Sequence, residues 1–280
     1  MKTLYITDLD GTLLDPSASV TPRSAALLNE AIAGGALFTV ATARTPATVA
    51  PLLSGIDVRI PVAVMTGAAL WNPADGRYSG VRHIDPDTAR EVLDLYASRG
   101  FDTFLYELRD NHVEIYHTGR MSRWERAFME AREGNPYKTF HRDGHGEMVL
   151  PPLPLRDVVL LFAMQPAEAV EDIAARLRSM DLPVVVNNYR DLYSGGAELM
   201  EVFGKGATKG EAVARLREIA GADRTVVFGD HVNDLPMMLG ADVAVAVANA
   251  VDEVKEAADI VIGPNTDDSV ARFILEDSRS

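Results

Sequence analysis

The sequence predicts an α/β protein, in which a doubly wound, Rossmann-like parallel sheet forms a core and an α+β domain is inserted into that core. Two observations lead to this fold class. Near both ends of the chain, short apolar runs recur without polar alternation, as strands covered on both faces require. In the middle of the chain, apolar and polar residues alternate, which is typical of an open sheet with helices on one face.

The core strands are expected at the continuous apolar runs, with helices between several of them. Thr21-Pro22 supplies an N-cap hydroxyl and a first-turn proline for one helix, and Thr208 can cap another over 209–219. Strand–helix alternation at both ends of the chain indicates the doubly wound core. The expected strands span residues 4–7, 37–41, 61–65, 225–228, 243–247 and 260–262.

The inserted domain is expected over residues 83–200, which leaves 1–82 and 201–280 for the core. Its first two strands are predicted to form a hairpin around the polar turn at 109–111. The expected elements are a helix over 86–97, strands over 101–107, 112–117 and 157–163, a helix over 166–180, and strands over 182–186 and 199–203.

Composition excludes several classes of protein. The chain has 280 residues, of which 47% are hydrophobic and 24% charged, as in an ordinary globular enzyme. Its formal net charge of −14 gives no electrostatic attraction to nucleic acid or to an anionic membrane, so neither partner is expected. The sequence has no cysteine and no run long enough to span a membrane. Its first residues are not expected to act as a signal peptide, and a cytoplasmic location is expected. Nothing in it indicates the oligomeric state.

Asp8 and Asp10 directly follow the first buried strand. Residues i and i+2 of an extended segment share a face, so both carboxylates should point the same way while Leu9 points into the core. Two carboxylates this close repel each other unless a cation or a shared proton lies between them. Because ligands of open α/β sheets bind beyond the carboxyl ends of the strands, this pair is a candidate site rather than a solvated turn.

Two further strand ends carry polar groups. Thr42 follows the second expected strand, where its hydroxyl could hold a phosphoryl oxygen, although such threonines commonly serve in turns and caps. Asp230, Asn233 and Asp234 follow the fourth. A second carboxylate pair with an amide suits a hard cation such as Mg²⁺, which prefers oxygen ligands.

A lysine precedes this last group in the chain. Lys209 begins a helix, where an ammonium and backbone N–H groups can face an anion. Lys205-Gly206 is a competing Lys-Gly pair four residues earlier. Lys209 is preferred because the apolar face of the helix continues directly from it.

Together these residues resemble the motifs of haloacid dehalogenase superfamily phosphatases. In chain order, the four motifs of that family match Asp8-Leu9-Asp10-Gly11-Thr12, Thr42, Lys209 and Gly229-Asp230-x-x-Asn233-Asp234. Thr42 follows Asp10 by 32 positions, too few for a cap domain, whereas Lys209 follows Thr42 by 167. The resemblance therefore points to the Cof-like branch, whose α/β cap is inserted after the third core strand. Residues 249–259 are also similar to this branch.

The resemblance implies a mechanism through an aspartyl-phosphate. Asp8 would be the nucleophile, and Asp10 would protonate the leaving oxygen and then deprotonate the attacking water. Thr42 and Lys209 would hold the phosphoryl oxygens. The implied ligands of Mg²⁺ are Asp8, Asp10 through its backbone carbonyl, and Asp230, oriented by Asn233 and Asp234.

Three positions depart from the usual pattern of the branch. Thr66-Gly67 stands where Asn-Gly is common, Thr42-Ala43-Arg44 where Thr-Gly-Arg is usual, and His231 where a small residue is favoured. Arg44, Thr66 and Gly67 are expected to contact the substrate, so the contact at Thr66 is altered. His231 is either a bulky loop residue beside the site or a contact to phosphate.

The expected activity is hydrolysis of a small phosphorylated metabolite. A sugar phosphate is the first choice, ahead of nucleotide, flavin-precursor and pyridoxal phosphates. A phosphomutase with the same chemistry and a non-enzymatic phospho-aspartate switch are the alternatives. The inserted cap would select the leaving group; its polar candidates, mostly expected to be ordinary surface residues, are Tyr106, Arg109, His112, His117, Arg120 and Trp124.

Overall fold

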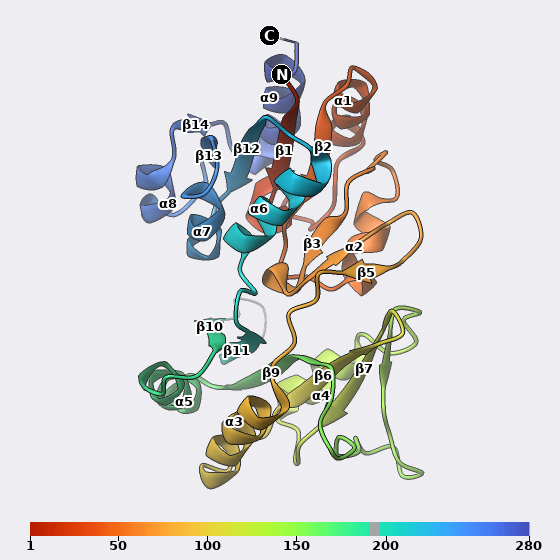
Figure 1. Ribbon diagram of the computed structural model, residues 1–280, viewed down its shortest axis with the longest axis vertical. Coiled ribbons are helices and arrows are strands. Elements are labelled where there is room, and N and C mark those ends of the chain that lie inside the picture. Colours follow the sequence, from red (N-terminus) through yellow and green to blue (C-terminus); the bar gives the residue numbers. More distant parts are fainter. Residues whose placement is uncertain (191–195, 280) are drawn as a thin grey trace. The chain divides into compact units, whose positions relative to one another are not determined.

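The computed structural model describes residues 1–190 and 196–279, and the chain falls into two compact units (Figure 1). The core unit comprises Met1–Gly80 and Ala207–Ser280, and the cap unit comprises Val81–Gly206. These limits differ by a few residues from those expected. The return to the core follows β11 (Ala197–Gly204), because this strand is continuous and pairs with its neighbour in the cap sheet along its length.

The core unit contains the predicted parallel sheet. Five strands pair in the order β14-β13-β12-β1-β2, all parallel. β1, β2, β12 and β13 are buried almost throughout, which explains why their sequences lack polar alternation. β14 lies at the edge of the sheet, and its Ile260 and Val261 are exposed. The strands are β1 (Thr3–Thr7), β2 (Leu37–Val40), β12 (Arg224–Gly229), β13 (Val243–Val247) and β14 (Ile260–Ile262).

The expected strand at 61–65 does not extend this sheet as a full strand. β3 (Val62–Val64) is joined to the residue after β2 by an isolated parallel bridge between Ala41 and Ala63, and it pairs antiparallel with β4 (Ala69–Trp71). β5 (Tyr78–Ser79) completes this small sheet, and neither β4 nor β5 was predicted. The cause is a sharp reversal at residues 65–67, all of which have positive φ.

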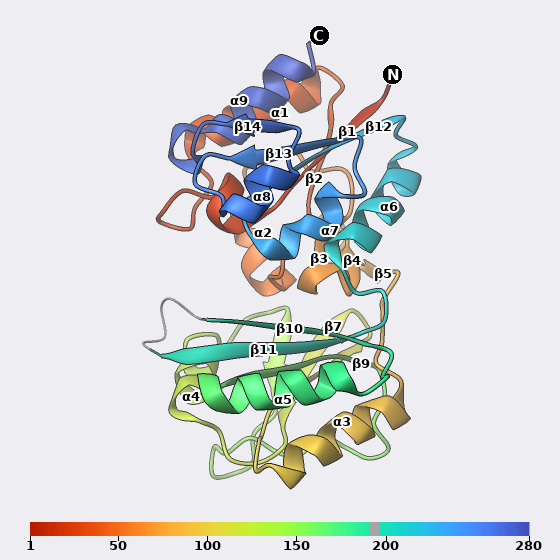
Figure 2. The same cartoon turned by 90° about the vertical axis from the view of Figure 1, so that its left-hand side faces the viewer.

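The core helices begin where the sequence places their N-caps. Thr21 accepts a hydrogen bond from Ser24 N, and Thr208 accepts one from Glu211 N. Figure 2 shows α1 and α9 on one face of the parallel sheet and α6 and α7 on the other, as a doubly wound fold requires. The core helices are α1 (Pro22–Ala33), α2 (Pro46–Leu53), α6 (Lys209–Ala220), α7 (Leu235–Met238), α8 (Asp252–Ala257) and α9 (Ser269–Asp277).

The cap unit has a mixed six-stranded sheet in the order β10-β11-β9-β6-β7-β8. Helices α3 (Pro86–Ser98) and α5 (Ala167–Ser179) share an apolar core with one face of this sheet. The other strands are β6 (Phe104–Arg109), β7 (His112–His117), β8 (Lys138–Phe140), β9 (Val158–Pro166) and β10 (Val184–Arg190). Among the described residues, no helix is long and apolar enough to span a bilayer.

The opposite face of the cap sheet carries a helix that the sequence analysis missed. On α4 (Arg123–Glu130), the Phe128 ring lies 4.9 Å from that of Phe162 and 6.0 Å from that of Phe104. These two residues alternate with Leu161 and Leu105, which belong to the core beneath α3 and α5. The expectation of helices on one face was therefore wrong. The Ser-x-x-Glu capping box at the start of α4 was the missed signal.

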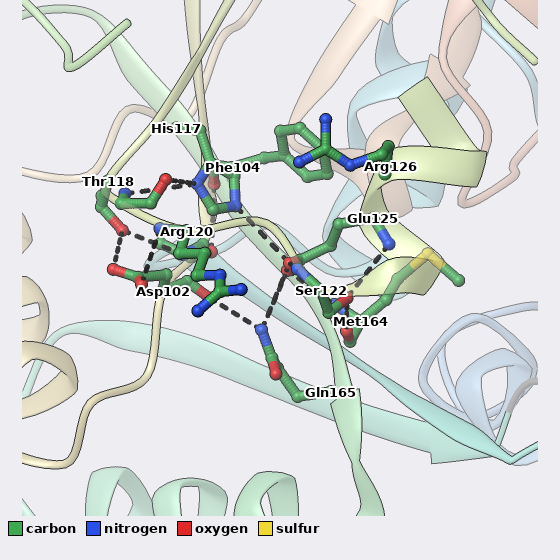
Figure 3. Close-up of polar contacts among 12 residues, drawn as sticks. Asp102, Phe104, His117, Thr118, Arg120, Ser122, Glu125, Arg126, Met164 and Gln165 are labelled. Carbon is green, nitrogen blue, oxygen red and sulfur yellow. Dashed lines mark hydrogen bonds and ion pairs between the residues drawn. The ribbon is translucent and has the colours of Figure 1, made fainter. Parts of the chain in front are cut away.

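A buried polar network fixes the start of α4 on the sheet (Figure 3). The Glu125 carboxylate accepts hydrogen bonds from Ser122 N at 2.7 Å, Met164 N at 3.2 Å and Gln165 Nε2 at 3.2 Å. Nε2 of His117 lies 3.6 Å from Glu125 Oε2. His117 and Tyr106 are therefore core residues of the cap, which corrects their interpretation as surface groups.

Candidate active site

Three neighbouring strands deliver the candidate residues to one edge of the core sheet. β12, β1 and β2 are adjacent and parallel, so their carboxyl ends coincide. Asp230 follows β12, Asp8 follows β1, and Thr42 lies just beyond β2. The chain turns within Leu9–Leu13, where Gly11 has φ 73°; Leu9 is buried and Asp10 is exposed. The Asp8 carboxylate contacts Lys209, whereas the Asp10 carboxylate contacts Arg44.

Lys209 links two of the candidate carboxylates. It is the first residue of α6, and its side chain is 0% exposed. Its Nζ lies 2.8 Å from Asp8 Oδ1 and 2.6 Å from Asp234 Oδ1. An ammonium without access to water is stabilised only when it is paired, and here two carboxylates pair with it. The competing Lys205 is exposed.

Asp234 organises the loop after β12. Its Oδ2 accepts hydrogen bonds from Asp230 N at 2.9 Å and His231 N at 3.1 Å, while its Oδ1 contacts Lys209. Asp230 in turn accepts a hydrogen bond from Thr12 Oγ1 at 2.7 Å. Both oxygens of Asp234 are therefore engaged within the protein, and this buried carboxylate holds Asp230 and Lys209 in place.

Burial shifts the acidity of the site. It raises the pKa of Asp8 to about 7, against the opposing charge of Lys209 and with a further increase from Asp234. Burial also raises the pKa of Asp230 to about 6, although the hydrogen bond from Thr12 acts in the opposite direction. Carboxylates that are difficult to ionise in this way are favourable ligands for a cation, which restores the charge balance.

The donor set fits a hard divalent cation. Oxygens of Asp8, Asp230 and Asp234 lie within 4.8 Å of one another. Since both oxygens of Asp234 are engaged within the protein, Asp8 and Asp230 are the carboxylates placed to bind the cation. The buried amide oxygen of Asn233, Oδ1, accepts no hydrogen bond from any residue that the structure describes. A set of oxygen donors without nitrogen or sulfur suits Mg²⁺. The carboxylate cluster contains Asp8, Asp230 and Asp234. The sequence analysis expected Asp8, Asp230 and the backbone carbonyl of Asp10 as ligands, so the carboxylate of Asp10 was not part of that expectation.

The Asp10 carboxylate instead pairs with Arg44. Arg44 Nε donates to Asp10 Oδ2 at 2.7 Å, and its Nη2 donates to Asp10 Oδ1 at 2.5 Å. This two-point geometry matches the planar guanidinium to the planar carboxylate. The Arg44 amide also donates to Thr42 Oγ1 at 3.2 Å. Asp10, Arg44 and Thr42 therefore form one connected group.

Thr66 and Gly67 lie beside this group. Thr66 N donates to Thr42 O at 3.0 Å, which brings the 65–67 turn against the end of β2. Thr66 has φ 56°, a conformation that costs a β-branched residue energy, and its buried hydroxyl has no partner among the described residues. Gly67 cannot carry a side chain, because a Cβ would lie 2.4 Å from Thr208 O.

Sequence reasoning left three residues of this region without a role. Gly11 has φ +73°, and a Cβ there would lie 2.3 Å from Asp230 Oδ2, so glycine is required. Thr12 holds Asp230, and Asn249 Nδ2 donates to Gly11 O at 2.7 Å. Each belongs to a segment that matched the family, which was the available signal.

Comparison with known proteins identifies the family. A family model described as haloacid dehalogenase-like hydrolase matches residues 5–274. The chain belongs to this family. It is an enzyme of the phosphatase class, as its named relatives are.

The relatives match nearly the whole chain. Pyridoxal phosphate phosphatase of Escherichia coli strain K12 is 27% identical over 281 residues, which cover 95% of each chain. The 5-amino-6-(5-phospho-D-ribitylamino)uracil phosphatase of Bacillus subtilis strain 168 is 25% identical over 282 residues, covering 98% of this chain and 96% of that one. A solved subclass IIB sugar phosphatase has a TM-score of 0.71 at 18% identity, with 99% and 98% of the two chains covered. This likeness confirms the predicted core with an inserted cap.

Proposed function

We propose that this phosphatase is a Mg²⁺-dependent phosphomonoesterase that hydrolyses a small phosphorylated metabolite through an aspartyl-phosphate on Asp8. The observation that carries the proposal is the contact of Asp8 with Lys209 beside Asp230 and Asp234. A nucleophilic carboxylate needs nearby positive charge to receive a phosphate ester, and the lysine with a bound cation supplies it.

The proposed reaction has two steps. An Asp8 oxygen attacks phosphorus, the ester P–O bond breaks, and the proton of Asp10 passes to the leaving alkoxide oxygen. Asp10 then takes a proton from water, whose oxygen attacks the phosphorus of the acyl phosphate, and the bond to Asp8 breaks to release inorganic phosphate. The free enzyme is restored with one water consumed.

The remaining polar residues would position these groups. Bound Mg²⁺ would neutralise phosphate charge, held by Asp8, Asp230 and the Asp10 backbone carbonyl. Asn233 and Asp234 would orient these ligands, and Asp234 already holds Asp230 and Lys209. Thr42 and Lys209 would hold the phosphoryl oxygens, and the unpartnered hydroxyl of Thr66 offers a further donor beside Gly67.

A sugar phosphate is the first proposed substrate, with pyridoxal phosphate and phosphorylated riboflavin precursors next. The named relatives act on the latter two classes, and the structural neighbour is a sugar phosphatase. We extend the proposal to a cytoplasmic location without nucleic-acid or membrane partners, in keeping with the net charge of −14.

Phosphate release from about 100 phosphorylated metabolites, with and without Mg²⁺, tests the proposal. Asp8→Asn should abolish release, and Asp10→Asn should reduce it about 10²–10⁴-fold. Asp57→Asn is the matched control, because Asp57 pairs with Arg59 at the surface. Residual turnover in Asp8→Asn would show that Asp8 is not the nucleophile. Labelling of Asp8 by acetyl phosphate without phosphate release would favour the mutase or the switch.

A further inference from the structure

The pairing of Arg44 with Asp10 changes the role that the sequence suggested for this arginine. The sequence analysis expected Arg44 to contact the substrate. In the structure, two different nitrogens of its guanidinium donate to the two oxygens of Asp10. Both donor positions therefore meet one carboxylate in the planar two-point geometry of an arginine–carboxylate pair.

Arg44 is the more firmly held partner of the pair. Its side chain is 25% exposed, against 55% for Asp10. Its backbone is fixed on both sides, because Arg44 N donates to Thr42 Oγ1 and Arg44 O accepts from Met65 N at 3.0 Å. The guanidinium therefore projects from an anchored backbone segment toward a carboxylate on a coiled loop.

Among the residues that the structure describes, the side chain of Asp10 contacts Arg44. It lies in the coiled segment Leu9–Leu13, directly before Gly11, whose backbone is left-handed. Without Arg44, a half-exposed aspartate there would sample several rotamers, and its carboxylate plane would rotate about the Cβ–Cγ bond. Contacts to both oxygens fix the plane as well as the position, which one ammonium contact cannot do.

We propose that Arg44 is a positioning residue that holds the Asp10 carboxylate for proton transfer, rather than a residue whose main contact is the substrate phosphate. This inference rests on the proposed function, in which Asp10 is the acid and base. A misplacement of about 1 Å in such a group costs on the order of 10²-fold in rate. Loss of the two-point contact should therefore reduce kcat and leave substrate affinity nearly unchanged.

Arg44→Lys tests this role, because it keeps the charge and loses the planar two-point contact. We expect kcat for an alkyl phosphate to fall about 10–100-fold. KM and the inhibition constant of inorganic phosphate should stay within about threefold. Arg59→Lys is the matched control, since Arg59 pairs with Asp57 at the surface, and it should retain wild-type kinetics.

A double-mutant cycle with Asp10→Asn separates the two roles of Arg44. If Arg44 acts through Asp10, adding Arg44→Lys to Asp10→Asn should cause less than about a twofold further loss. Losses that multiply, or a phosphate inhibition constant that weakens as much as kcat/KM falls, would overturn the inference. Asp8→Asn, run in parallel, reports on the proposed function: turnover in that variant defeats the aspartyl-phosphate mechanism itself. Circular dichroism and Mg²⁺ binding establish that each variant is folded.

Discussion

Removing the ammonium of Lys209 should leave two buried carboxylates facing each other. Lys209→Met keeps the length of the side chain and deletes the charge that contacts Asp8 at 2.8 Å and Asp234 at 2.6 Å. The side chains of Lys209 and Asp234 are 0% exposed and that of Asp8 is 8% exposed, so water cannot replace the lost cation. The variant therefore has an uncompensated buried charge.

The expected cost follows from these distances. At an effective dielectric constant of about 20, each contact is worth roughly 6 kcal/mol of Coulomb energy before desolvation is counted. Burial of the ammonium offsets several kcal/mol of this gain. Truncating one partner of a buried pair typically costs about 3–5 kcal/mol, because the remaining charge stays buried. We expect a decrease of that size in the unfolding free energy of the metal-free protein at pH 8.

The decrease in unfolding free energy caused by Lys209→Met, here called the deficit, should depend on pH and on Mg²⁺. Burial already raises the pKa of Asp8 to about 7 against the opposing charge of Lys209, and loss of the lysine raises this pKa further. A carboxyl whose pKa is higher in the folded state is relatively stabilising below its unfolded pKa, and this contribution is lost as pH rises through the folded value. The deficit of Lys209→Met should therefore shrink as pH falls from 8 toward 5. Added Mg²⁺ should reduce it as well.

Urea denaturation in EDTA measures this difference. The chain has two tryptophans, so Trp124→Phe leaves Trp71 of the core unit as the fluorescent reporter. Lys205→Met is the matched control and should unfold with the background protein, since Lys205 is exposed. A Lys209→Met variant within about 1 kcal/mol of the background at pH 8, or a deficit that is equal at pH 5 and pH 8, would refute the reasoning.

Three further changes test other contacts. Gly11→Ala should displace Asp230, whose Oδ2 would lie 2.3 Å from the new Cβ, and weaken Mg²⁺ affinity at least about tenfold by titration calorimetry. Glu125→Gln should destabilise the start of α4 by about 1–3 kcal/mol, seen as hydrogen exchange of residues 122–131 that is faster by about tenfold or more. Burial raises the pKa of Asp277, but the hydrogen bonds from Arg224 outweigh burial and hold this pKa below its ordinary value. Asp277→Asn should therefore lower stability at pH 7, with a difference that disappears as pH falls through that lowered pKa.

Two of these changes have a matched control variant. Gly35→Ala shares the positive φ of Gly11→Ala but meets no atom within 4 Å, so Mg²⁺ affinity should not change. Glu171→Gln alters an exposed residue of α5 and should leave the exchange of residues 122–131 unaffected. A Glu125→Gln variant with unchanged exchange would contradict the role of the buried carboxylate. For Asp277→Asn, a stability difference that persists in strong acid would contradict the ionic origin.

The sequence was sufficient to predict the five parallel strands of the core sheet and to select the candidate residues, because local rules govern both, whereas the expected core strand at 61–65 pairs in a separate small sheet. Uninterrupted apolar runs indicated the parallel strands, and β13 and β14 have the limits that the sequence predicts. Since parallel neighbours end at the same edge, Asp8 and Asp230 could be expected together. The cap was harder, because its mixed sheet allows several strand orders, and α4 with its short capping signal was overlooked.

The sequence by itself determined the fold class, the inserted cap and the residue types of the site. Only the tertiary structure decided which groups pair: Lys209 with Asp8 and Asp234, and Arg44 with Asp10. The physical reason is that the strand pattern fixes only where a backbone segment ends. The partner of a charged side chain depends on the turn geometry after that end, on burial, and on residues far away in the chain. In the turn after Asp8, for example, a Cβ on Gly11 would lie 2.3 Å from Asp230 Oδ2, a close approach that the strand pattern does not predict.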